Sequence, residues 1–415
     1  MGKTVAEKIL SIHAGKELKA GDFAVCKVDF AFGQDGTSAI ILDRLKELEI
    51  KQLKTDFCMV IDHNAPAPNE GVSRIHKRMR QFAEENGVGL FDIGCGVCHQ
   101  VIPESGKILP GDLVIGADSH TCTYGAIGAF ATGVGSTDLA ISLATGKNWF
   151  KVPETFKITV KGKIPKGIFA KDIILYLIGQ IKADGATYKA IEFSGPVIEQ
   201  LDMDGRFTMC NMVVEMGAKA GFTPQDKITA SWLKNKTDKK IKPQAADKDA
   251  GYAKILEFDI SQLKPQVASP HSVDNTKSVD ELKNTQINEA FLGTCTNGRI
   301  ADLKIAASIL KSKKVAQGVK FIIAPASRAI FLEALKLGYV DTFIKAGAVI
   351  VAPGCGPCVG THNGVPADQE VVISSANRNF KGRMGNPNAF IYLASPATVT
   401  ASAVEGKITD PRSYL

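Results

Sequence analysis

Two short stretches near the C-terminal end decide the fold: Gly293-Thr-Cys295-Thr-Asn-Gly-Arg299 and Pro353-Gly-Cys355-Gly-Pro-Cys358-Val-Gly360. Each follows an apolar run, over residues 289–292 and 348–352, that predicts a buried strand. Because loops after parallel strands leave the same edge of a sheet, the three thiols are expected to converge. Three thiolates suit a soft metal centre with one open position, since a closed structural site normally takes four ligands. The Cys-x-x-Cys spacing alone fits a metal, a redox pair or buried thiols equally well.

The composition is that of a globular α/β enzyme. The 415 residues are 45% hydrophobic and 22% charged and include 39 glycines, which allows two to four domains. A net charge of +7 without a basic, aromatic-rich stripe argues against nucleic acid as a partner. Nine cysteines, no secretory signal and no apolar run of about 18 residues predict a cytoplasmic protein with no membrane contact.

The first unit, expected over residues 1–153, alternates strands with helices. Strands are predicted over 27–32, 57–61, 89–92 and 112–115, and helices over 4–12, 37–48, 72–85 and 137–145. This alternation predicts a mostly parallel sheet covered on both faces. Five polar residues fall just beyond strand ends, where such sheets place their sites: Asp62, His63, His99, Asp118 and His120.

Two further units follow. The second, expected over 154–268, begins with a strand at 155–160 and contains a helix over 206–219, which would place Asn211 and Glu215 on one face. Its lysine-rich insert at 234–242 predicts a solvated loop. The third unit, 269–415, repeats the α/β pattern, with helices over 301–310, 328–337 and 397–404 and strands over 319–323 and 371–373.

These motifs, in this order, resemble those of the aconitase superfamily across nearly the whole chain. The resemblance rests on both cysteine stretches, Asp62-His63, Gly-Ala-Asp118-Ser-His120-Thr, Asn211 with Glu215, and Ala-Asn377-Arg-Asn-Phe-Lys-Gly-Arg383. Within the superfamily, Gly382-Arg-Met-Gly-Asn-Pro387 and Leu393-Ala-Ser-Pro396 are similar to the large subunits of 3-isopropylmalate dehydratase, homoaconitase and 2,3-dimethylmalate dehydratase.

The resemblance implies a fold, a cofactor and a set of site residues. The fold is three α/β/α units of the aconitase type, with mostly parallel sheets around a cluster cleft. The cofactor is one 4Fe-4S cluster on Cys295, Cys355 and Cys358, with one iron free of protein ligands. The implied catalytic residues are Asp62, His63, His99, Asp118, His120 and Glu215. The implied substrate-binding residues are Ser119, Asn211, Asn377, Arg378 and Arg383.

The implied activity is a hydro-lyase that isomerises a malate-type diacid, in first place 3-isopropylmalate and 2-isopropylmalate in leucine biosynthesis. Homoaconitase, (R)-2-methylmalate dehydratase and 2,3-dimethylmalate dehydratase are the alternatives. The chain is expected to lack the swivelling domain of single-chain aconitases, so a small subunit should supply it. Two rivals stay open: a Cys3His zinc site completed by His362, and a non-catalytic metal- or RNA-binding regulator. Six remaining cysteines are expected to be bystanders: Cys26, Cys58, Cys95, Cys98, Cys122 and Cys210.

Overall fold

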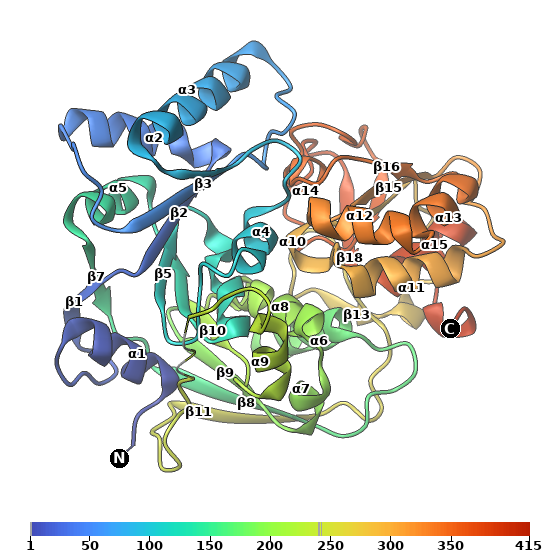
Figure 1. Cartoon of the computed structure of the whole chain (residues 1–415). Coiled ribbons are helices and arrows are strands. Elements are labelled where there is room, and N and C mark those ends of the chain that lie inside the picture. The colour runs from blue at the N-terminus through green and yellow to red at the C-terminus, as the bar shows by residue number, and fades with distance from the viewer. Residues whose placement is uncertain (1, 240, 242) are drawn as a thin grey trace.

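Parallel strands form most of the sheets, as the alternation of strands and helices predicts (Figure 1). The computed structural model describes residues 2–239, 241 and 243–415. Among these residues, none of the helices is long and apolar enough to cross a membrane.

The first unit is a five-stranded parallel sheet in the order β4-β3-β2-β5-β6. Its strands are β2 (Phe30–Gln34), β3 (Asp56–Val60), β4 (Gly89–Phe91), β5 (Leu113–Gly116) and β6 (Phe130–Gly133). Its helices are α1 (Val5–Ala14), α2 (Asp35–Glu47), α3 (Glu70–Asn86), α4 (Cys98–Glu104), the 3-10 helix η1 (Ser119–Ile127) and α5 (Ser136–Thr145).

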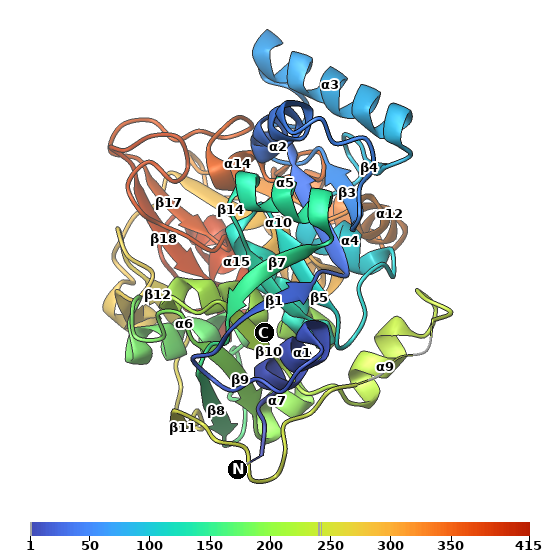
Figure 2. The ribbon, with the colours of Figure 1, turned by 90° about the vertical axis from the view of Figure 1, so that its left-hand side faces the viewer.

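A separate two-stranded antiparallel ribbon joins β1 (Phe23–Lys27) to β7 (Lys147–Lys151). The single strand predicted over 27–32 is therefore wrong, because β1 ends at Lys27 and β2 begins at Phe30. The two strands enter different sheets. Figure 2 shows the ribbon at the front of the molecule when it is turned by 90°.

The second unit is a four-stranded parallel sheet in the order β10-β9-β8-β11. Its strands are β8 (Thr155–Lys161), β9 (Ala190–Ser194), β10 (Ala220–Phe222) and β11 (Lys254–Asp259). Its helices are α6 (Ala170–Ile181), α7 (Pro196–Gln200), α8 (Met203–Asn211), the 3-10 helix η2 (Met212–Met216) and α9 (Lys227–Leu233). Of the insert predicted as a loop over 234–242, residues 240 and 242 lie outside the described residues.

The helix predicted over 206–219 is not one α-helix. The α-helix α8 ends at Asn211, and the chain tightens into η2 before Gly217 ends it with a φ of 87°. A residue other than glycine is rarely found in that left-handed region. Asn211 and Glu215 consequently lie on different elements.

The third unit is a seven-stranded mixed sheet in the order β13-β12-β18-β17-β14-β15-β16. Its strands are β12 (Gln266–Ala268), β13 (Thr276–Ser278), β14 (Glu289–Gly293), β15 (Lys320–Ala324), β16 (Val349–Ile350), β17 (Val371–Ser374) and β18 (Phe390–Ala394). Its helices are η3 (Val279–Glu281), α10 (Thr294–Asn297), α11 (Ile300–Leu310), α12 (Arg328–Lys336), α13 (Tyr339–Ala346), α14 (Gly356–Val359), α15 (Pro396–Glu405) and η4 (Pro411–Ser413). β12 pairs with β18, so its residues belong to the third sheet although they fall inside the second predicted unit.

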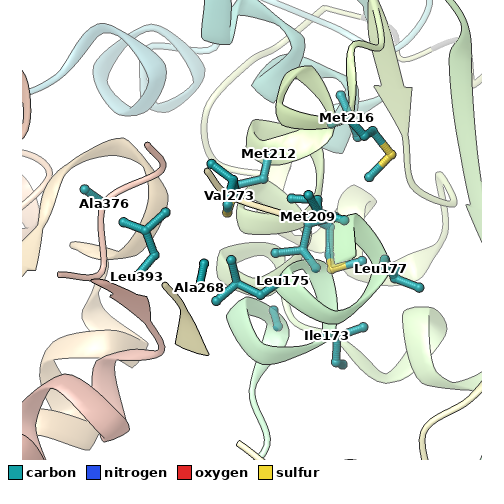
Figure 3. Close-up of a cluster of buried hydrophobic side chains, with 14 of the residues drawn as sticks. Ile173, Leu175, Leu177, Met209, Met212, Met216, Ala268, Val273, Ala376 and Leu393 are labelled. Atoms are coloured by element: carbon teal, nitrogen blue, oxygen red, sulfur yellow. The ribbon is translucent and has the colours of Figure 1, made fainter. Parts of the chain in front are cut away.

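A shared apolar core joins the second and third units. Leu175 and Met209 from the second unit belong to the same buried cluster as Ala268 and Leu393 from the third (Figure 3). Burial of such side chains contributes roughly 1.5–3 kcal/mol each, so this contact resists separation. The units that carry Glu215 and the cysteines are thus held at a fixed distance.

Candidate active site

The three motif cysteines lie on two short helices at the carboxyl ends of β14 and β16. Cys295 is in α10, Cys355 precedes α14 and Cys358 lies within it, and all three side chains are buried. Gly356 lets the second loop close tightly, because a Cβ there would lie 2.4 Å from Cε1 of His362. The convergence predicted from the two strands therefore has a structural basis in this edge of the sheet.

Side-chain N–H groups point at two of the three sulfurs. Asn211 Nδ2 donates to Cys295 Sγ at 3.3 Å, and Asn377 Nδ2 donates to the same sulfur at 3.6 Å. Arg383 Nη2 donates to Cys358 Sγ at 3.3 Å. Such donors stabilise a thiolate more than a thiol, as a metal-binding sulfur requires.

The three sulfurs are not gathered as closely as the ligands of a single metal ion. Within the described ranges, the single group of three or more donor atoms that all lie within 4.8 Å of one another is Asp62, His63 and Cys355. The three sulfurs do not form such a group, whereas one zinc ion would bring them to about 3.8 Å. His362 is also outside it. The three sulfurs and His362 are therefore not gathered around one point among the described residues, and both the Cys3His zinc site and the iron-sulfur cluster stay predictions.

Burial favours the neutral form of these thiols. It raises the pKa of Cys295 to about 11, with the negative charge of Cys358 adding to the effect. The pKa of Cys355 lies well above its usual value because of burial, the Asp62 carboxylate and the other two sulfurs. A bound cationic centre removes this penalty, since metal ligation deprotonates a thiol outright.

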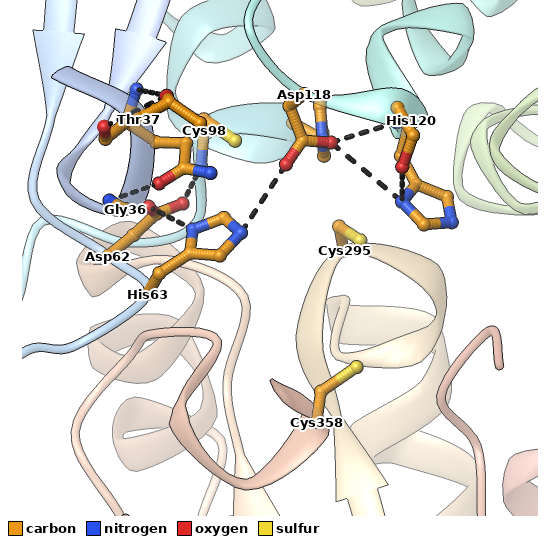
Figure 4. Close-up of polar contacts among 12 residues, drawn as sticks. Gly36, Thr37, Asp62, His63, Cys98, Asp118, His120, Cys295 and Cys358 are labelled. Atoms are coloured by element: carbon orange, nitrogen blue, oxygen red, sulfur yellow. Dashed lines mark hydrogen bonds and ion pairs between the residues drawn. The ribbon is translucent and has the colours of Figure 1, made fainter. Parts of the chain in front are cut away.

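Asp118 is the acceptor on which three histidines converge, two of which, His63 and His120, are labelled in Figure 4. Its Oδ1 lies 2.8 Å from His99 Nε2 and accepts the His120 backbone N–H at 2.8 Å, and its Oδ2 lies 3.3 Å from His63 Nε2. Burial alone would raise the pKa of the Asp118 carboxyl, but these histidines hold it well below its usual range. The carboxylate is therefore ionised and fixes the orientation of the rings.

Asp62 and His63 join the first unit to the cysteine loop of the third. Asp62 Oδ1 lies 2.7 Å from His63 Nδ1, its Oδ2 accepts the Cys98 backbone N–H at 2.7 Å, and its carbonyl accepts the Cys355 backbone N–H at 2.6 Å. Burial opposes the charged form of His63, but Asp62 and Asp118 raise its pKa well above the usual value. The pair therefore holds a positive imidazolium beside Cys355.

Asp35 supports this loop, and sequence reasoning missed it. Its carboxylate accepts the backbone N–H groups of Asp62, His63 and Asn64 at 3.0, 2.8 and 2.9 Å. Burial alone would raise the pKa of Asp35, but His76, His63 and these N–H groups lower it instead. The one sequence signal was its position, directly after β2 at the same edge of the sheet.

A second polar chain runs from His120 through Glu215 to Arg378. Glu215 Oε1 lies 2.9 Å from His120 Nε2 and accepts from Arg378 Nε at 2.8 Å, while Arg378 Nη1 donates to Ser119 Oγ at 2.9 Å. Burial alone would raise the pKa of Glu215, but His120 and Arg378 lower it below its usual value. All three units therefore contribute to one network.

Three buried nitrogens in this region have no hydrogen-bond partner within the part of the chain that is described: His99 Nδ1, Arg383 Nε and His362 Nε2, the last beside the Cys355–Cys358 loop. A buried N–H without a partner costs about 1–3 kcal/mol. All three atoms are therefore suited to a ligand. Arg383 Nη2 donates to Cys358 Sγ, so the free Nε of the same guanidinium lies near that sulfur.

Every residue that the sequence placed in the site is accounted for. Asp62, His63, His99, Asp118, His120, Ser119, Glu215 and Arg378 form the two networks above, and Asn211, Asn377 and Arg383 contact sulfurs. Their catalytic and binding roles remain predictions. Cys98 is buried at the start of α4 and serves through its backbone N–H, whereas Cys95 is partly exposed.

Fold and site together define a three-unit α/β protein with a buried thiol, histidine and carboxylate centre. The model of the aconitase family (aconitate hydratase) matches residues 7–285 and 275–406. The 3-isopropylmalate dehydratase large subunit of Elusimicrobium minutum is 51% identical over the full length of both chains. A probable methanogen homoaconitase large subunit of Methanosarcina mazei is 52% identical, covering 93% of this chain and 98% of that one.

A solved structure shares the fold. The holo-form of Thermococcus kodakaraensis aconitase X superposes with a TM-score of 0.51 at 14% identity, covering 92% of this chain and 93% of that chain. The chain belongs to the aconitase family, a family of hydro-lyases. Membership implies an iron-sulfur centre in general terms, and the names of the relatives as large subunits imply a small-subunit partner.

Proposed function

We propose that this chain is the catalytic large subunit of 3-isopropylmalate dehydratase, which moves a hydroxyl between adjacent carbons of a substituted malate by dehydration and rehydration in leucine biosynthesis. The observation that supports this most is the meeting of the Asp118 histidine network with the sulfurs and their N–H donors. Full-length relatives of that name support the substrate. We also propose a cytoplasmic location for this reaction.

Cys295, Cys355 and Cys358 would hold one 4Fe-4S cluster with one iron free of protein ligands. When bound, the cluster supplies a Lewis acid that neutralises the charge of the leaving hydroxyl. Asn211 and Asn377 hold Cys295 by N–H···S contacts, and Arg383 holds Cys358. These three side chains thus position the ligands in addition to the substrate-binding role expected of them.

The histidines move protons, and the carboxylates fix the orientation of the histidine rings. Asp118 accepts from His99 Nε2, so Nδ1 is the ring atom left to exchange a proton with a hydroxyl. Glu215 fixes His120 in the same way through Nε2, and Asp62 fixes His63 through Nδ1. Because each ring is fixed before substrate arrives, little reorganisation is needed during the reaction.

The arginines bind the substrate carboxylates. A guanidinium can grip a carboxylate with two parallel N–H groups, which suits a malate-type diacid with two such groups. Arg383 offers the buried Nε without a partner, and Arg378 is already oriented by Glu215 and Ser119. Ser119 then lies where it can donate to the same carboxylate as Arg378.

A small subunit completes the site. Removing a proton next to a carboxylate requires a positioned base. Among the described residues of the two networks, the carboxylates already accept hydrogen bonds and the free His99 Nδ1 is assigned to the substrate hydroxyl, so a further group is needed as this base. We assign the base, and the pocket for the substrate side chain, to the small subunit.

The second candidate is the large subunit of homoaconitase. It is favoured by the 52% identity to the probable methanogen homoaconitase large subunit. The two candidates share the centre described above and differ in the substrate side chain that the small subunit would read.

One assay separates these functions. The chain is purified without oxygen, loaded with iron and sulfide, combined with the small subunit from the same genome, and offered 3-isopropylmalate and homoaconitate separately. Turnover at least tenfold faster on 3-isopropylmalate supports the proposal, and the reverse preference supports homoaconitase. A colourless protein that binds stoichiometric zinc and turns over neither substrate would overturn both.

A further inference from the structure

The antiparallel ribbon β1–β7 has an unusual outer face. Successive side chains of a strand point to opposite faces, and an outer face is normally polar. Here the outer positions pair Phe23 with Lys151, Val25 with Trp149 and Lys27 with Lys147. Phe23, Val25 and Trp149 are 63%, 61% and 61% exposed, although such large apolar groups are usually covered. These six residues are called the ribbon face below.

The ribbon face is ordered and not a loose edge. Phe23 stacks on Trp149 with ring centroids 6.3 Å apart, and Lys151 Nζ lies 5.8 Å from the Phe23 ring centre. The opposite side of the ribbon is anchored in the core of the first unit by Ala24, Cys26 and Phe150, which are buried. A rigid, exposed aromatic pair on a fixed support is typical of a binding anchor.

The ribbon face is continuous with the active site. A cavity of about 540 Å³ has Asp118 and Ser119 as well as Trp149 and Tyr188 in its lining. A neighbouring cavity of about 500 Å³ is lined by Phe23, Trp149, Lys151 and Tyr188. A molecule seated on the ribbon face can therefore extend a segment to the residues that orient His120 and Arg378.

The charge of the ribbon face indicates what covers it. Lys27, Lys147 and Lys151 surround the aromatic pair, and none of them forms an ion pair with a residue that the structure describes. A second copy of this chain would set lysines against lysines, which is unfavourable. The surface fits a partner that carries apolar side chains ringed by carboxylates.

We propose that the ribbon face is the docking surface for the small subunit, with Trp149 as its anchor and Lys27, Lys147 and Lys151 pairing with carboxylates of that subunit. This inference rests on the proposed function, which requires such a subunit over the site. It places the contact beside the cavity that leads to Ser119, where the base and the side-chain pocket must enter.

Trp149 itself reports the contact. The chain has two tryptophans, and the other, Trp232, packs against Phe207 with ring centroids 5.2 Å apart. In a Trp232→Phe background, titration with the small subunit should move the Trp149 emission to shorter wavelength as water leaves the indole. A small subunit made without tryptophan keeps the signal specific. Saturating the complex without any change in Trp149 emission would contradict the proposal.

Variants measure the energy of the contact. Trp149→Ala should raise the Kd for the small subunit by about tenfold or more, as loss of an aromatic anchor does. Lys27→Glu, Lys147→Glu and Lys151→Glu combined should do the same and should reverse the effect of added salt. Circular dichroism and the thermal unfolding midpoint check that each variant folds.

A matched control lies on the far side of the third unit. Leu335 in α12 is 57% exposed and apolar but adjoins neither cavity, so Leu335→Ser should leave the Kd within twofold. An unchanged Kd in both ribbon variants, with normal turnover, would overturn the docking surface and leave the proposed function intact. Self-association of the large chain that Trp149→Ala abolishes would assign the face to a second copy instead. Failure of the wild-type chain to bind the small subunit or to turn over substrate would instead remove the proposed function.

Discussion

Lys171 Nζ donates a hydrogen bond to the backbone carbonyl of Ser375 at 2.7 Å. A second bond reaches the carbonyl of Ala376 at 2.5 Å. The lysine comes from α6 of the second unit and is fully buried, and burial lowers its pKa to about 7. Burying an amine costs free energy. The compensating benefit must come from the loop that Lys171 holds in place, which continues into Asn377 and Arg378.

We expect Lys171→Met to loosen that loop. The change leaves two buried carbonyls without donors, at about 1–3 kcal/mol each. The free energy of unfolding should therefore fall by about 2–4 kcal/mol in urea titrations. KM should rise while the iron content stays near that of the wild type. The exposed Lys166→Met is the control, and a Lys171→Met chain with wild-type stability and KM would refute the role.

Iron content distinguishes variants of the three ligand cysteines from variants of the other cysteines. Cys295→Ser, Cys355→Ser and Cys358→Ser should each lose nearly all iron after anaerobic loading, because a serine hydroxyl is a poor ligand for this soft metal centre. Cys95→Ser is the matched control, since its thiol is partly exposed and outside the sulfur group. Equal loss of iron from Cys95→Ser would show that the ligands have been assigned wrongly.

Arg383→Lys keeps the positive charge but removes the planar pair of guanidinium N–H groups. The free Nε and the contact to Cys358 Sγ are both lost, so substrate binding should weaken by roughly the 1.5–3 kcal/mol of a charge-assisted hydrogen bond. That is a rise of about 10- to 150-fold in KM for the reconstituted enzyme. Arg328→Lys, on the exposed side of α12, should leave KM unchanged. A KM unchanged by Arg383→Lys would place this arginine outside the substrate site.

Glu289 makes stability depend on pH away from the site. It begins β14, its side chain is buried, and burial raises its pKa to about 7 although Lys320 Nζ lies 3.1 Å away. Lys320 offsets this burial only in part, and Oε1 has no hydrogen-bond partner among the residues that the structure describes. The folded chain therefore holds a proton that the unfolded chain releases near pH 4.3.

Stability should consequently fall as pH rises from about 4.3 to about 7, because the folded state binds more protons in that window. Glu289→Gln removes this titration. The difference in unfolding free energy between pH 5 and pH 8, measured on the iron-free chain, should be smaller in the variant by on the order of 2 kcal/mol. Parallel pH profiles for the two chains would show that Glu289 is ionised in the folded state.

The sequence predicted the parallel sheets and most strand positions, because apolar runs followed by glycine-rich loops are local signals. The strand predicted over 289–292 is β14 to within one residue. The start of α4 was missed, since the Asp62 carboxylate that accepts the Cys98 N–H lies 36 residues away along the chain. The tightening of α8 into η2 was also missed, because apolar spacing does not distinguish an α-helix from a 3-10 turn.

The polar networks were predictable only in part. Five residues beyond strand ends were found by position, because every parallel strand delivers its next loop to one edge. Asp35 lay at such an edge too, but nothing local shows that its carboxylate would collect three N–H groups from another loop. The ribbon face was not predicted for the same reason. The end of β1 and the start of β7 are 120 residues apart in sequence, and their outer positions become neighbours only after the strands pair.

The hydrogen bond from the Cys355 N–H to the Asp62 carbonyl has a consequence for how the centre is made. Synthesis runs from the N-terminus, and domains fold as units in that direction. Asp62, Asp118 and Glu215 leave the ribosome before any of the three cysteines of the loops. The nascent chain therefore contains the histidines and carboxylates of both networks before it contains any of the three loop cysteines. We expect the three-cysteine site to be completed last, when the Cys355 N–H bonds to the carbonyl of Asp62.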